Sequence, residues 1–430
     1  MFDVIIVGGG AAGFYGALHI ARGNPKLKIA ILEKGRNVLA KVKVSGGGRC
    51  NVTNTIFEPD LLAGYYPRGS KELLGPFYTH SSNDTVSFFE EHGIPLKTEK
   101  DGRIFPITNN SKTVIDFFLR EATKSGIQII KNSAVLGIVP PLKKNETSDR
   151  LWKIESARKT YSAKTVLITT GNNAKIWRML GQIGHNIVQP VPSLFSFNIK
   201  DKRISGLQGI STNARVTIVK KKFTSKEITV GLKSDLRSKQ QLKAEGPLLI
   251  THWGLSGPAV LKLSAWGARE LFEYGYRFRI KVNWVPDYHQ NSVPDLLRQV
   301  KSVEGKKTVY RTNAVDIPRK LWGKLVRASG VDPTATWSQM STADIDRLAF
   351  MLSSSEFTVE GKSTNKEEFV TAGGVDLKQI NFKTFGSKLH PNLYLAGEVL
   401  NIDGITGGFN FQSAWTGSYI AALAIASTSQ

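Results

Sequence analysis

The residues that could do chemistry gather in three glycine-rich segments. The first is the turn Gly8-Gly9-Gly10-Ala11-Ala12-Gly13, which follows an apolar run and precedes a helical pattern that ends at Arg22. A second apolar run begins at Lys28 and ends at Glu33, about 20 residues beyond the turn. Strand, glycine turn, helix, strand and acid in this order are typical of the βαβ unit that binds a dinucleotide.

Each of the glycines at 8, 10 and 13 has a physical reason in such a unit. Gly8 permits the tight turn, Gly10 lets the backbone approach a pyrophosphate, and Gly13 lets the helix pack closely on the strand. The N-terminus of the helix then faces the phosphates. The carboxylate of Glu33 can accept hydrogen bonds from an adenosine ribose.

The second segment holds three consecutive glycines, Gly46 to Gly48, followed by Arg49, Cys50 and Asn51. It could be only a flexible surface loop. Three glycines are costly to order, however. Placed just after the βαβ unit, they favour backbone that passes very close to a flat cofactor.

The third segment lies near the C-terminus. An apolar run ends at Gly397-Glu398, and Gly407-Gly408 then precede a helix predicted from Gln412 to Ala426. Because strand, glycine turn and helix recur here, we expect the two chain ends to build one site. A helix N-terminus at 409–412 suits the carbonyls of a flavin ring, where reduced flavin carries negative charge. NAD enzymes need no such second element, so FAD is favoured over NAD.

Cys50 is the only cysteine and has two interpretations. It is either a small packed residue, as buried cysteines often are, or the catalytic proton donor beside the flavin. A thiol is an acid only while protonated, and the neighbouring Arg49 favours thiolate. His252 and Trp253 stand in a strand-like apolar run, which predicts buried core residues.

Between these segments the hydrophobic pattern changes from that of strands to that of helices. Alternating runs such as Ala214 to Val219 predict an antiparallel β insertion from residue 191 onward. From Pro294 to Met351 the pattern is helical, with Ser341 or Thr342 as a helix N-cap.

The 430 residues carry a net charge of +23, from 58 Lys plus Arg against 35 Asp plus Glu. With 41% hydrophobic residues the chain is in the globular range, which excludes disordered, collagenous and coiled-coil classes. The excess charge favours a polyanionic partner, nucleic acid or an anionic membrane surface. It is concentrated in 200–243 and 301–327, and Lys220, Lys221 and Lys222 at a predicted hairpin turn are candidate RNA-binding residues. The alternative is a set of solvated, lysine-rich loops.

A single cysteine permits no intramolecular disulfide, so a cytoplasmic protein is expected. The start of the chain lacks a signal-peptide pattern, no apolar run has the length of a membrane span, and no cluster has the spacing of a metal site.

The chain resembles the BaiN/RdsA family of bacterial flavoproteins over nearly its whole length. The motifs that carry the resemblance are VIIVGGGAAG, KVKVSGGGRCNVTN, GRIFP, THWGLSGPAVLKLS, TAGGVDL and LAGEVLNIDGITGGFNFQSAWTGSYIA. SGGGRCN and GGFNFQSA are specific to the family. One departure is Asn401, where relatives often have Asp.

The resemblance implies an α/β fold with a Rossmann-like FAD domain built from both chain ends. We expect this domain at 1–190 and 371–430, a barrel-like antiparallel β domain at 191–265 and 354–370, and a helical domain at 266–353. The cofactor-binding positions expected from the motifs and the resemblance together are Gly8, Gly10, Ala12, Gly13, Glu33, Lys34, Lys41, Ser45, Gly46, Gly48, Arg49, Asn51, Gly171, Gly397, Glu398, Gly408, Asn410 and Gln412.

Members of the family are linked to reduction of a uridine in large-subunit ribosomal RNA to dihydrouridine, to reduction of steroid-like enones and to oxidation of small amines. We expect an FAD-dependent reductase of ribosomal RNA with NADH or NADPH as electron donor. The target base must be unpaired or flipped out to reach a flavin. The alternatives are a small-molecule oxidoreductase and a non-catalytic RNA-binding assembly factor with structural FAD.

Overall fold

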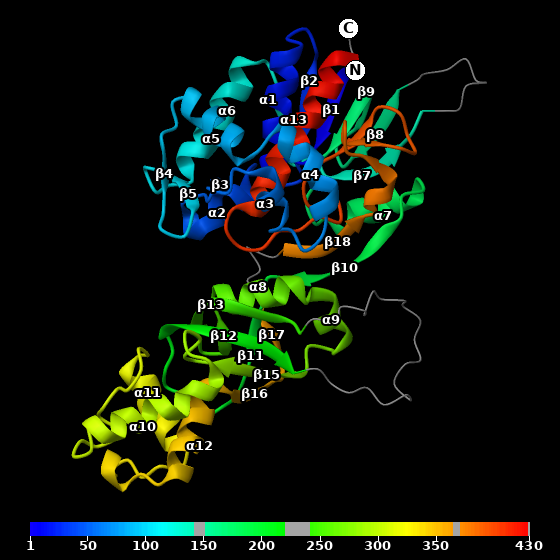
Figure 1. The fold of residues 1–430 in the computed structure, drawn as a ribbon. Helices are drawn as coiled ribbons and strands as arrows, with labels where there is room; N and C mark the ends of the chain where they lie inside the picture. The colour runs from blue at the N-terminus through cyan, green and yellow to red at the C-terminus, as the bar shows by residue number, and fades with distance from the viewer. Residues whose placement is uncertain (142–150, 220–240, 364–369, 429–430) are drawn as a thin grey trace, which may run out of the picture. The chain divides into compact units, whose positions relative to one another are not determined.

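The computed structural model describes residues 1–141, 151–219, 241–363 and 370–428. The chain forms two compact units, Met1–Val191 with Lys366–Gln430 and Pro192–Asn365 (Figure 1). The first unit is therefore built from both chain ends. The α/β fold class with a Rossmann-type domain is confirmed. The finer division at 265–266 and 353–354 stays a prediction.

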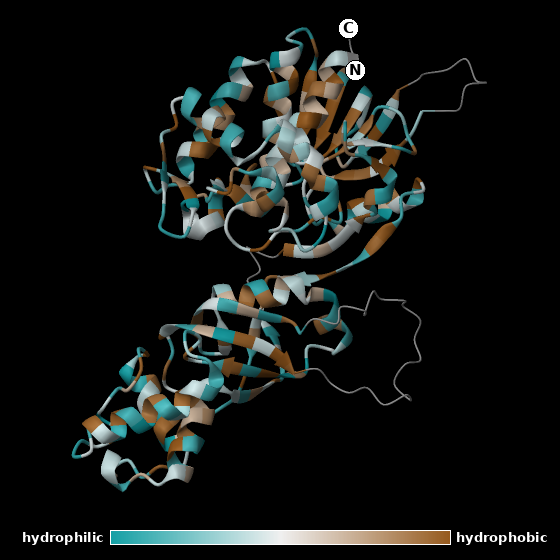
Figure 2. Ribbon diagram, viewed as in Figure 1, coloured by the Kyte–Doolittle hydropathy of each residue, from teal (hydrophilic) through white to brown (hydrophobic). Residues whose placement is uncertain are grey.

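A sheet with a parallel centre organises the first unit. Strand β1 (Phe2–Val7) pairs in parallel with β2 (Ile29–Leu32) on one side and β9 (Thr160–Ile168) on the other. Strands β6 (Gln128–Ile130) and β21 (Leu393–Leu395) extend the parallel pairing outward. All four residues of β2 are buried, as expected for a strand covered on both faces. Figure 2 shows these central strands in the colour of hydrophobic residues.

Helices α1 (Ala11–Gly23) and α13 (Phe409–Thr428) pack together although they come from opposite ends of the chain. A Cβ atom at Gly16 would lie 3.4 Å from Cβ of Ser418, and one at Gly23 would lie 2.7 Å from Cβ of Ala426. Small residues thus let the two backbones approach. The helix predicted from Gln412 is confirmed and begins three residues earlier, at Phe409.

The other elements of this unit complete its layers and edges. The strands are β3 (Thr53–Asn54), β4 (Leu96–Thr98), β5 (Arg103–Pro106), β7 (Val135–Val139), β8 (Trp152–Ser156), β18 (Val370–Val375), β19 (Ile380–Asn381), β20 (Gly386–Ser387) and β10 (Ile187–Ser193), whose last two residues belong to the second unit. The helices are α2 (Ala40–Gly48), α3 (Pro59–Ala63), α4 (Ser70–Thr79), α5 (Ser82–Glu91), α6 (Lys112–Lys124), α7 (Ala174–Gln182) and the 3₁₀ turn η3 (Leu377–Gln379).

The second unit holds an antiparallel sheet that closes on itself. Within the described residues the strand order is β16-β15-β12-β13-β14-β11-β17. The two strands at opposite ends of this order, β16 (Ser355–Val359) and β17 (Gly361–Ser363), are separated in the chain only by Glu360. The sheet must therefore curl until its ends meet, which confirms the barrel-like insertion.

The other strands of this sheet are β11 (Ser196–Asn198), β12 (Ser211–Val219), β13 (Lys243–Ile250), β14 (Gly254–Ser256) and β15 (Phe278–Asn283). The helices of the unit are α8 (Pro258–Trp266), α9 (Ala268–Glu273), α10 (Val293–Val303), α11 (Arg319–Ala328), α12 (Thr342–Ser353) and the 3₁₀ turns η1 (Gln290–Ser292) and η2 (Trp337–Gln339).

Helices α10, α11 and α12 confirm the helical pattern, and Ser341 caps α12 through a capping box with Asp344. Strand β15 is a difference, because it lies inside the range expected to be helical. Phe278, Ile280 and Val282 are buried on one face of this strand. The alternation is that of a strand, but it covers only six residues between two helical stretches.

One hydrophobic core runs through the strands and the helices of the second unit. It includes Val216 of β12, Leu321 and Trp322 of α11 and Leu348 of α12, all fully buried. Within the described ranges, every helix falls short of the apolar length that a bilayer crossing requires.

Candidate functional site

The first glycine turn has the tight geometry that its sequence predicts. Gly8 has φ +112°, and a Cβ atom there would lie 2.7 Å from the carbonyl oxygen of Thr169. A Cβ at Gly13 would lie 2.1 Å from the carbonyl oxygen of Gly8. Only glycine fits at these two positions, so turn and helix pack closely on the strands.

Gly10 differs from its neighbours. It is the N-cap of α1, with φ −95° and no side-chain cap. No atom lies within 4 Å of a Cβ built on Gly10, so protein packing does not require glycine there. Ala12, another cofactor-binding position expected in this turn, is buried. The open space at the helix N-terminus is where a phosphate would be bound.

Glu33 is held against this turn by its carboxylate. Its two oxygens accept hydrogen bonds from the backbone N–H groups of Gly9 (3.0 Å) and Gly35 (2.8 Å). The acid predicted at the end of β2 is therefore fixed beside the glycines. Lys34, the next residue, is exposed.

The second segment forms a kink at the end of α2. Gly46, Gly47 and Gly48 have φ values of 57°, 69° and 85°, in the left-handed region that favours glycine. A Cβ at Gly46 would meet the Phe105 ring at 2.8 Å, whereas one at Gly47 would meet nothing within 4 Å. The hydroxyl of Ser45 donates to the carbonyl of Val42 at 2.9 Å. The segment is thus ordered, with one open backbone position.

Arg49 is engaged inside the protein. Its Nη1 atom lies 2.5 Å from Oε1 of Glu99, its Nε donates to the Gly46 carbonyl at 3.2 Å, and its guanidinium lies 4.0 Å from the centre of the Phe105 ring. These contacts hold the glycine kink against β5. A direct flavin contact by Arg49 stays a prediction.

Cys50 is fully buried and has φ +63°. Burial raises the pKa of its thiol to about 12, against the opposing effect of a hydrogen bond with Ser45. The thiol therefore stays protonated, and the guanidinium that was expected to favour thiolate pairs with Glu99 instead. A proton donor must also reach the reacting atom, and protein atoms enclose this thiol on all sides. These observations favour the packing interpretation.

Residues 51–54 and 407–412 are bonded to each other. The Thr53 hydroxyl donates to Oε1 of Gln412 at 2.6 Å, and Nδ2 of Asn54 donates to the Gly407 carbonyl at 3.1 Å. A Cβ at Gly408 would lie 2.6 Å from the Thr53 carbonyl oxygen. The second and third glycine segments are therefore in contact, as the sequence led us to expect.

Three predicted amide side chains have their polar atoms committed within the protein. The Asn51 amide, with its oxygen turned toward the Gly408 N–H at 2.9 Å, donates to the carbonyls of Thr53 and Ile104. Asn410 makes two 2.9 Å bonds with the backbone of Gly404. Gln412 is fully buried and donates to the Thr416 hydroxyl at 3.0 Å. Their direct cofactor contacts stay predictions, and their observed contacts order the segments.

A polar cluster joins α2 to the ends of β9 and β21. Nζ of Lys41 lies 2.6 Å from Oε2 of Glu398 and donates to Oδ1 of Asn172 at 3.1 Å. Gly171, with φ +61°, would place a Cβ 3.5 Å from the same Glu398 oxygen. Gly397, with φ +78°, precedes this acid. The sequence did not single out Asn172, whose only signal is its position after Gly171.

Two buried polar atoms lie beside these elements with no hydrogen-bond partner among the described residues, Oγ1 of Thr170 and Oδ1 of Asn401. The Cα atom of Thr170 lies 2.9 Å from the Cβ position of Gly8. An unsatisfied buried hydroxyl is costly unless a ligand or water meets it. This atom, the open Gly10 backbone and the anchored Glu33 fit a dinucleotide cofactor.

His252 and Trp253 are not core residues, so that expectation is wrong. They lie in the turn between β13 and β14, and Trp253 is 69% exposed. The apolar strands on both sides of the turn misled the prediction. Lys220, Lys221 and Lys222 lie outside the described residues.

The fold and the glycine turns together define a Rossmann-type protein with a dinucleotide-binding βαβ unit. The chain belongs to the HI0933-like protein Rossmann domain family, whose sequence profile matches residues 2–424. It is similar to a ribosomal RNA dihydrouridine synthase of Escherichia coli, with 26% identity over 429 residues that cover 98% of this chain and 97% of the relative. It is also similar to a 3-dehydro-bile acid delta(4,6)-reductase of Clostridium scindens, with 25% identity and 98% of both chains covered.

A solved structure shares the fold. It is a 3-ketosteroid-delta4-(5alpha)-dehydrogenase from Rhodococcus jostii, with a TM-score of 0.51, 10% identity, and 99% of this chain and 96% of that chain covered. At this identity the likeness concerns the fold alone.

Proposed function

We propose that the protein is an FAD-dependent oxidoreductase that reduces a uridine in large-subunit ribosomal RNA to dihydrouridine, with NADH or NADPH as electron donor. The observation that carries the cofactor assignment is the contact between 51–54 and 407–412, two segments from opposite ends of the chain. A dinucleotide fold for NAD alone does not need this second element.

The bound flavin supplies hydride transfer. In the proposal, the N-terminus of α1 and the open backbone at Gly10 bind the pyrophosphate, and Glu33 accepts from the ribose. The kink at 46–48 and the turn at 407–408 approach the ring. The ion pair between Lys41 and Glu398 orders α2 against the end of β21.

The choice of RNA as substrate rests on two supports, the relatives named as ribosomal RNA dihydrouridine synthases and the net charge of +23. Both synthases match over nearly the full chain, at 26% and 27% identity. The second candidate function is reduction of a small enone, favoured by the bile acid reductase at 25% identity. Small-molecule chemistry leaves the charge excess without a role.

The test is nucleoside mass spectrometry of ribosomal RNA from cells with and without the gene. We expect dihydrouridine at one position to disappear in the deletion and to return with the wild-type gene. An unchanged dihydrouridine content would overturn the RNA assignment. In that case, oxidation of NADH or NADPH by purified protein with an enone acceptor would support the second candidate.

A further inference from the structure

Helix α11 presents four cations on one side. Arg319, Lys320, Lys324 and Arg327 fall within about 140° of the helix circumference at 3.6 residues per turn. Arg319, Lys320 and Arg327 are exposed and Lys324 is half-buried. The sequence from 305 to 331 contains one acidic residue, Asp316, which precedes the helix.

Contacts with neighbouring loops hold two of these cations in place. Nζ of Lys324 donates to the carbonyl of Lys202 at 3.5 Å, so the exposed Lys202 lies beside the helix. The Arg327 guanidinium lies 4.8 Å from the centre of the Tyr310 ring. We call Lys202, Arg319, Lys320, Lys324 and Arg327 the α11 basic face.

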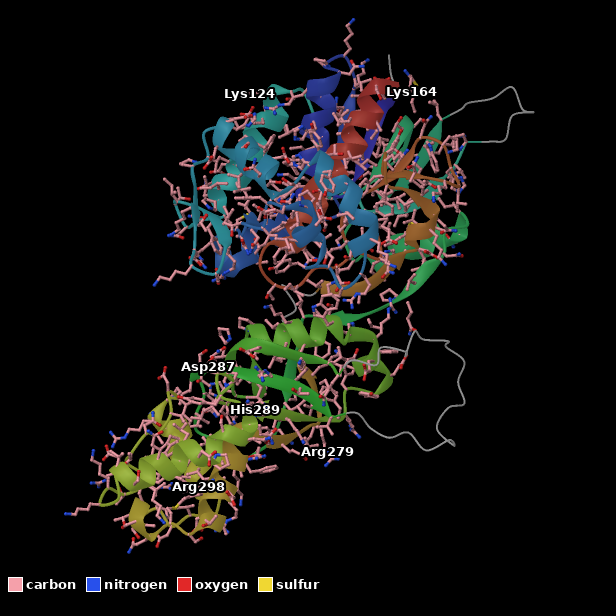
Figure 3. All side chains as sticks on the ribbon, viewed as in Figure 1. Lys124, Lys164, Arg279, Asp287, His289 and Arg298 are labelled. Atoms are coloured by element: carbon pink, nitrogen blue, oxygen red, sulfur yellow. The ribbon has the colours of Figure 1, made fainter. Side chains whose placement is uncertain are left out.

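Three cations near α11 are paired with carboxylates, whereas those of the α11 basic face are not. Arg298, labelled in Figure 3, lies 2.6 Å from Asp295 and 3.3 Å from Asp346. Lys307 pairs with Glu304 at 2.7 Å, and Arg347 pairs with Asp344. Within the part of the chain that the structure describes, no member of the α11 basic face has a carboxylate partner.

Helix stability does not account for Arg319 and Lys320, whereas Arg327 lies in the last turn of α11, where the helix dipole favours a cation. Arg319 and Lys320 occupy the first turn of α11, where the helix dipole disfavours positive charge. Replacement by neutral residues would stabilise the helix itself. Arg319 and Lys320 therefore point to an external anion.

The apolar side of α11 distinguishes a nucleic acid from a membrane surface. Leu321, Trp322 and Leu325 are fully buried in the core of the unit. A helix that binds in a membrane interface needs exposed apolar residues on the face opposite its cations. Cations without a carboxylate partner, on a helix whose apolar side is buried, are instead typical of surfaces that contact a phosphate backbone.

We propose that the α11 basic face binds the phosphate backbone of the RNA substrate. This inference rests on the proposed function and assigns the RNA contact to described residues of the second unit. The contacts are electrostatic and carry no base specificity. They hold the RNA while another part of the protein selects the target base.

The test compares two triple variants of the full-length holoprotein that lose the same charge. The first, Lys320→Gln with Lys324→Gln and Arg327→Gln, removes unpaired cations. The control, Arg298→Gln with Lys307→Gln and Arg347→Gln, removes paired ones. The affinity for a labelled single-stranded fragment of large-subunit ribosomal RNA is measured by fluorescence anisotropy over a range of salt concentrations.

We expect the slope of log affinity against log salt to flatten by about two in the first variant, since each single-strand phosphate contact contributes about 0.7. The control should keep the wild-type slope. The proposal is overturned if the salt slope flattens equally in both variants, or if it is unchanged in both. The flavin absorbance and the circular dichroism of each variant report on folding. If the triple variant does not fold, the exposed Lys320→Gln alone should flatten the slope by about 0.7.

Two further measurements separate the possible causes of failure. If the first variant loses binding to phosphatidylglycerol vesicles but keeps the wild-type slope with RNA, the ligand is a lipid surface and the proposal is overturned. If the slope changes as expected while ribosomal dihydrouridine does not depend on the gene, the α11 basic face stands as an RNA surface and the proposed reaction fails. If ribosomal dihydrouridine depends on the gene but the first variant keeps the wild-type salt slope, the RNA contact is not made by the α11 basic face, and the proposed reaction stands.

Discussion

At the scale of single residues, local packing distinguishes a glycine that the fold requires from one that it does not. It also distinguishes a packing role for the Cys50 thiol from a catalytic one. Gly13 is required by a neighbour that a Cβ would meet at 2.1 Å, whereas Gly10 has no neighbour at all within 4 Å. Cys50 is enclosed by protein, and its thiol pKa is raised by burial. Gly10 is therefore a position where function and folding can be tested apart, and Cys50 is a position where packing dominates.

We expect Gly10→Ala to retain the fold and lose the cofactor. The φ of −95° suits alanine, so the free energy of unfolding of the apoprotein should change by less than about 1 kcal/mol. FAD affinity should fall at least about tenfold, because the methyl group occupies the space beside the helix N-terminus. Bound flavin is measured by absorbance after gel filtration. Gly75→Ala on α4, another open position, is the control and should keep its FAD. Full FAD retention in Gly10→Ala would show that the pyrophosphate binds elsewhere.

We expect Cys50→Ala to lower stability and leave turnover nearly intact. Removal of a buried sulfur should lower the free energy of unfolding by about 1 kcal/mol. A general acid would instead be worth roughly 10²–10⁴ in rate. The measurements are chemical denaturation and single-turnover reduction of substrate by the reduced holoprotein. A loss of 10²-fold or more with normal FAD content would return Cys50 to the role of proton donor.

At the scale of elements, α1, α4, α5 and α13 enclose a group of aromatic and histidine rings. His80 follows α4, stacks on Tyr419 at 4.3 Å and has its Nε2 2.9 Å from the Tyr15 hydroxyl. His19 of α1 lies edge-on to Tyr419 at 4.8 Å. These contacts place two imidazoles inside the helical layer of the first unit.

Burial lowers the pKa of both imidazoles, to about 3 for His19 and about 4 for His80. At His19, the neighbouring His80, Arg22 and His92 lower the pKa further, whereas at His80 the carboxylate of Asp84 opposes the shift. Both imidazoles are therefore neutral in the folded protein at pH 7.

We expect the first unit to lose stability as the pH falls from about 6.5 to about 4. In this window the unfolded chain binds protons at both imidazoles and the folded chain does not, so the free energy of unfolding falls by up to about 1.4 kcal/mol per pH unit for each histidine. Above the unfolded pKa the effect disappears. Urea unfolding at several pH values measures it. His80→Gln, which can still bond Tyr15, should remove one histidine's share of the pH dependence. An unchanged dependence in this variant would contradict the assignment.

Sequence predicts elements whose signal is local. The turn at 8–13 and Glu33 lie within one βαβ unit, so spacing alone defines them. The pair of Lys41 and Glu398 joins residues 357 positions apart, and no local pattern reports such a contact. The prediction that Trp253 is buried was wrong for a related reason. The apolar strands on both sides of it do not reveal the turn that exposes it.

At the scale of the whole molecule, the chain separates a cofactor unit from an inserted unit with its own core. The core of the inserted unit is formed by residues between Phe195 and Val359. All the described candidate cofactor residues lie in the other unit, and the α11 basic face lies in the inserted one. A β insertion was predictable from alternation. The closure of its sheet was not derivable from that alternation, because it depends on pairings of β16 and β17 with strands far along the chain.

We expect this separation to appear in calorimetry as two unfolding transitions, of which FAD raises only one. A ligand that binds one folded unit stabilises that unit by RT ln(1 + [L]/Kd), about 2.7 kcal/mol at one hundred times Kd. Because the inserted unit has a core of its own, its transition should not respond to FAD. The measurement compares apoprotein with protein at saturating FAD. Gly10→Ala should abolish the FAD-dependent shift and keep both transitions, while Gly75→Ala should preserve the shift. A single transition that moves as a whole with FAD would mean that the two units unfold together, and that cofactor binding also stabilises the unit that carries the α11 basic face.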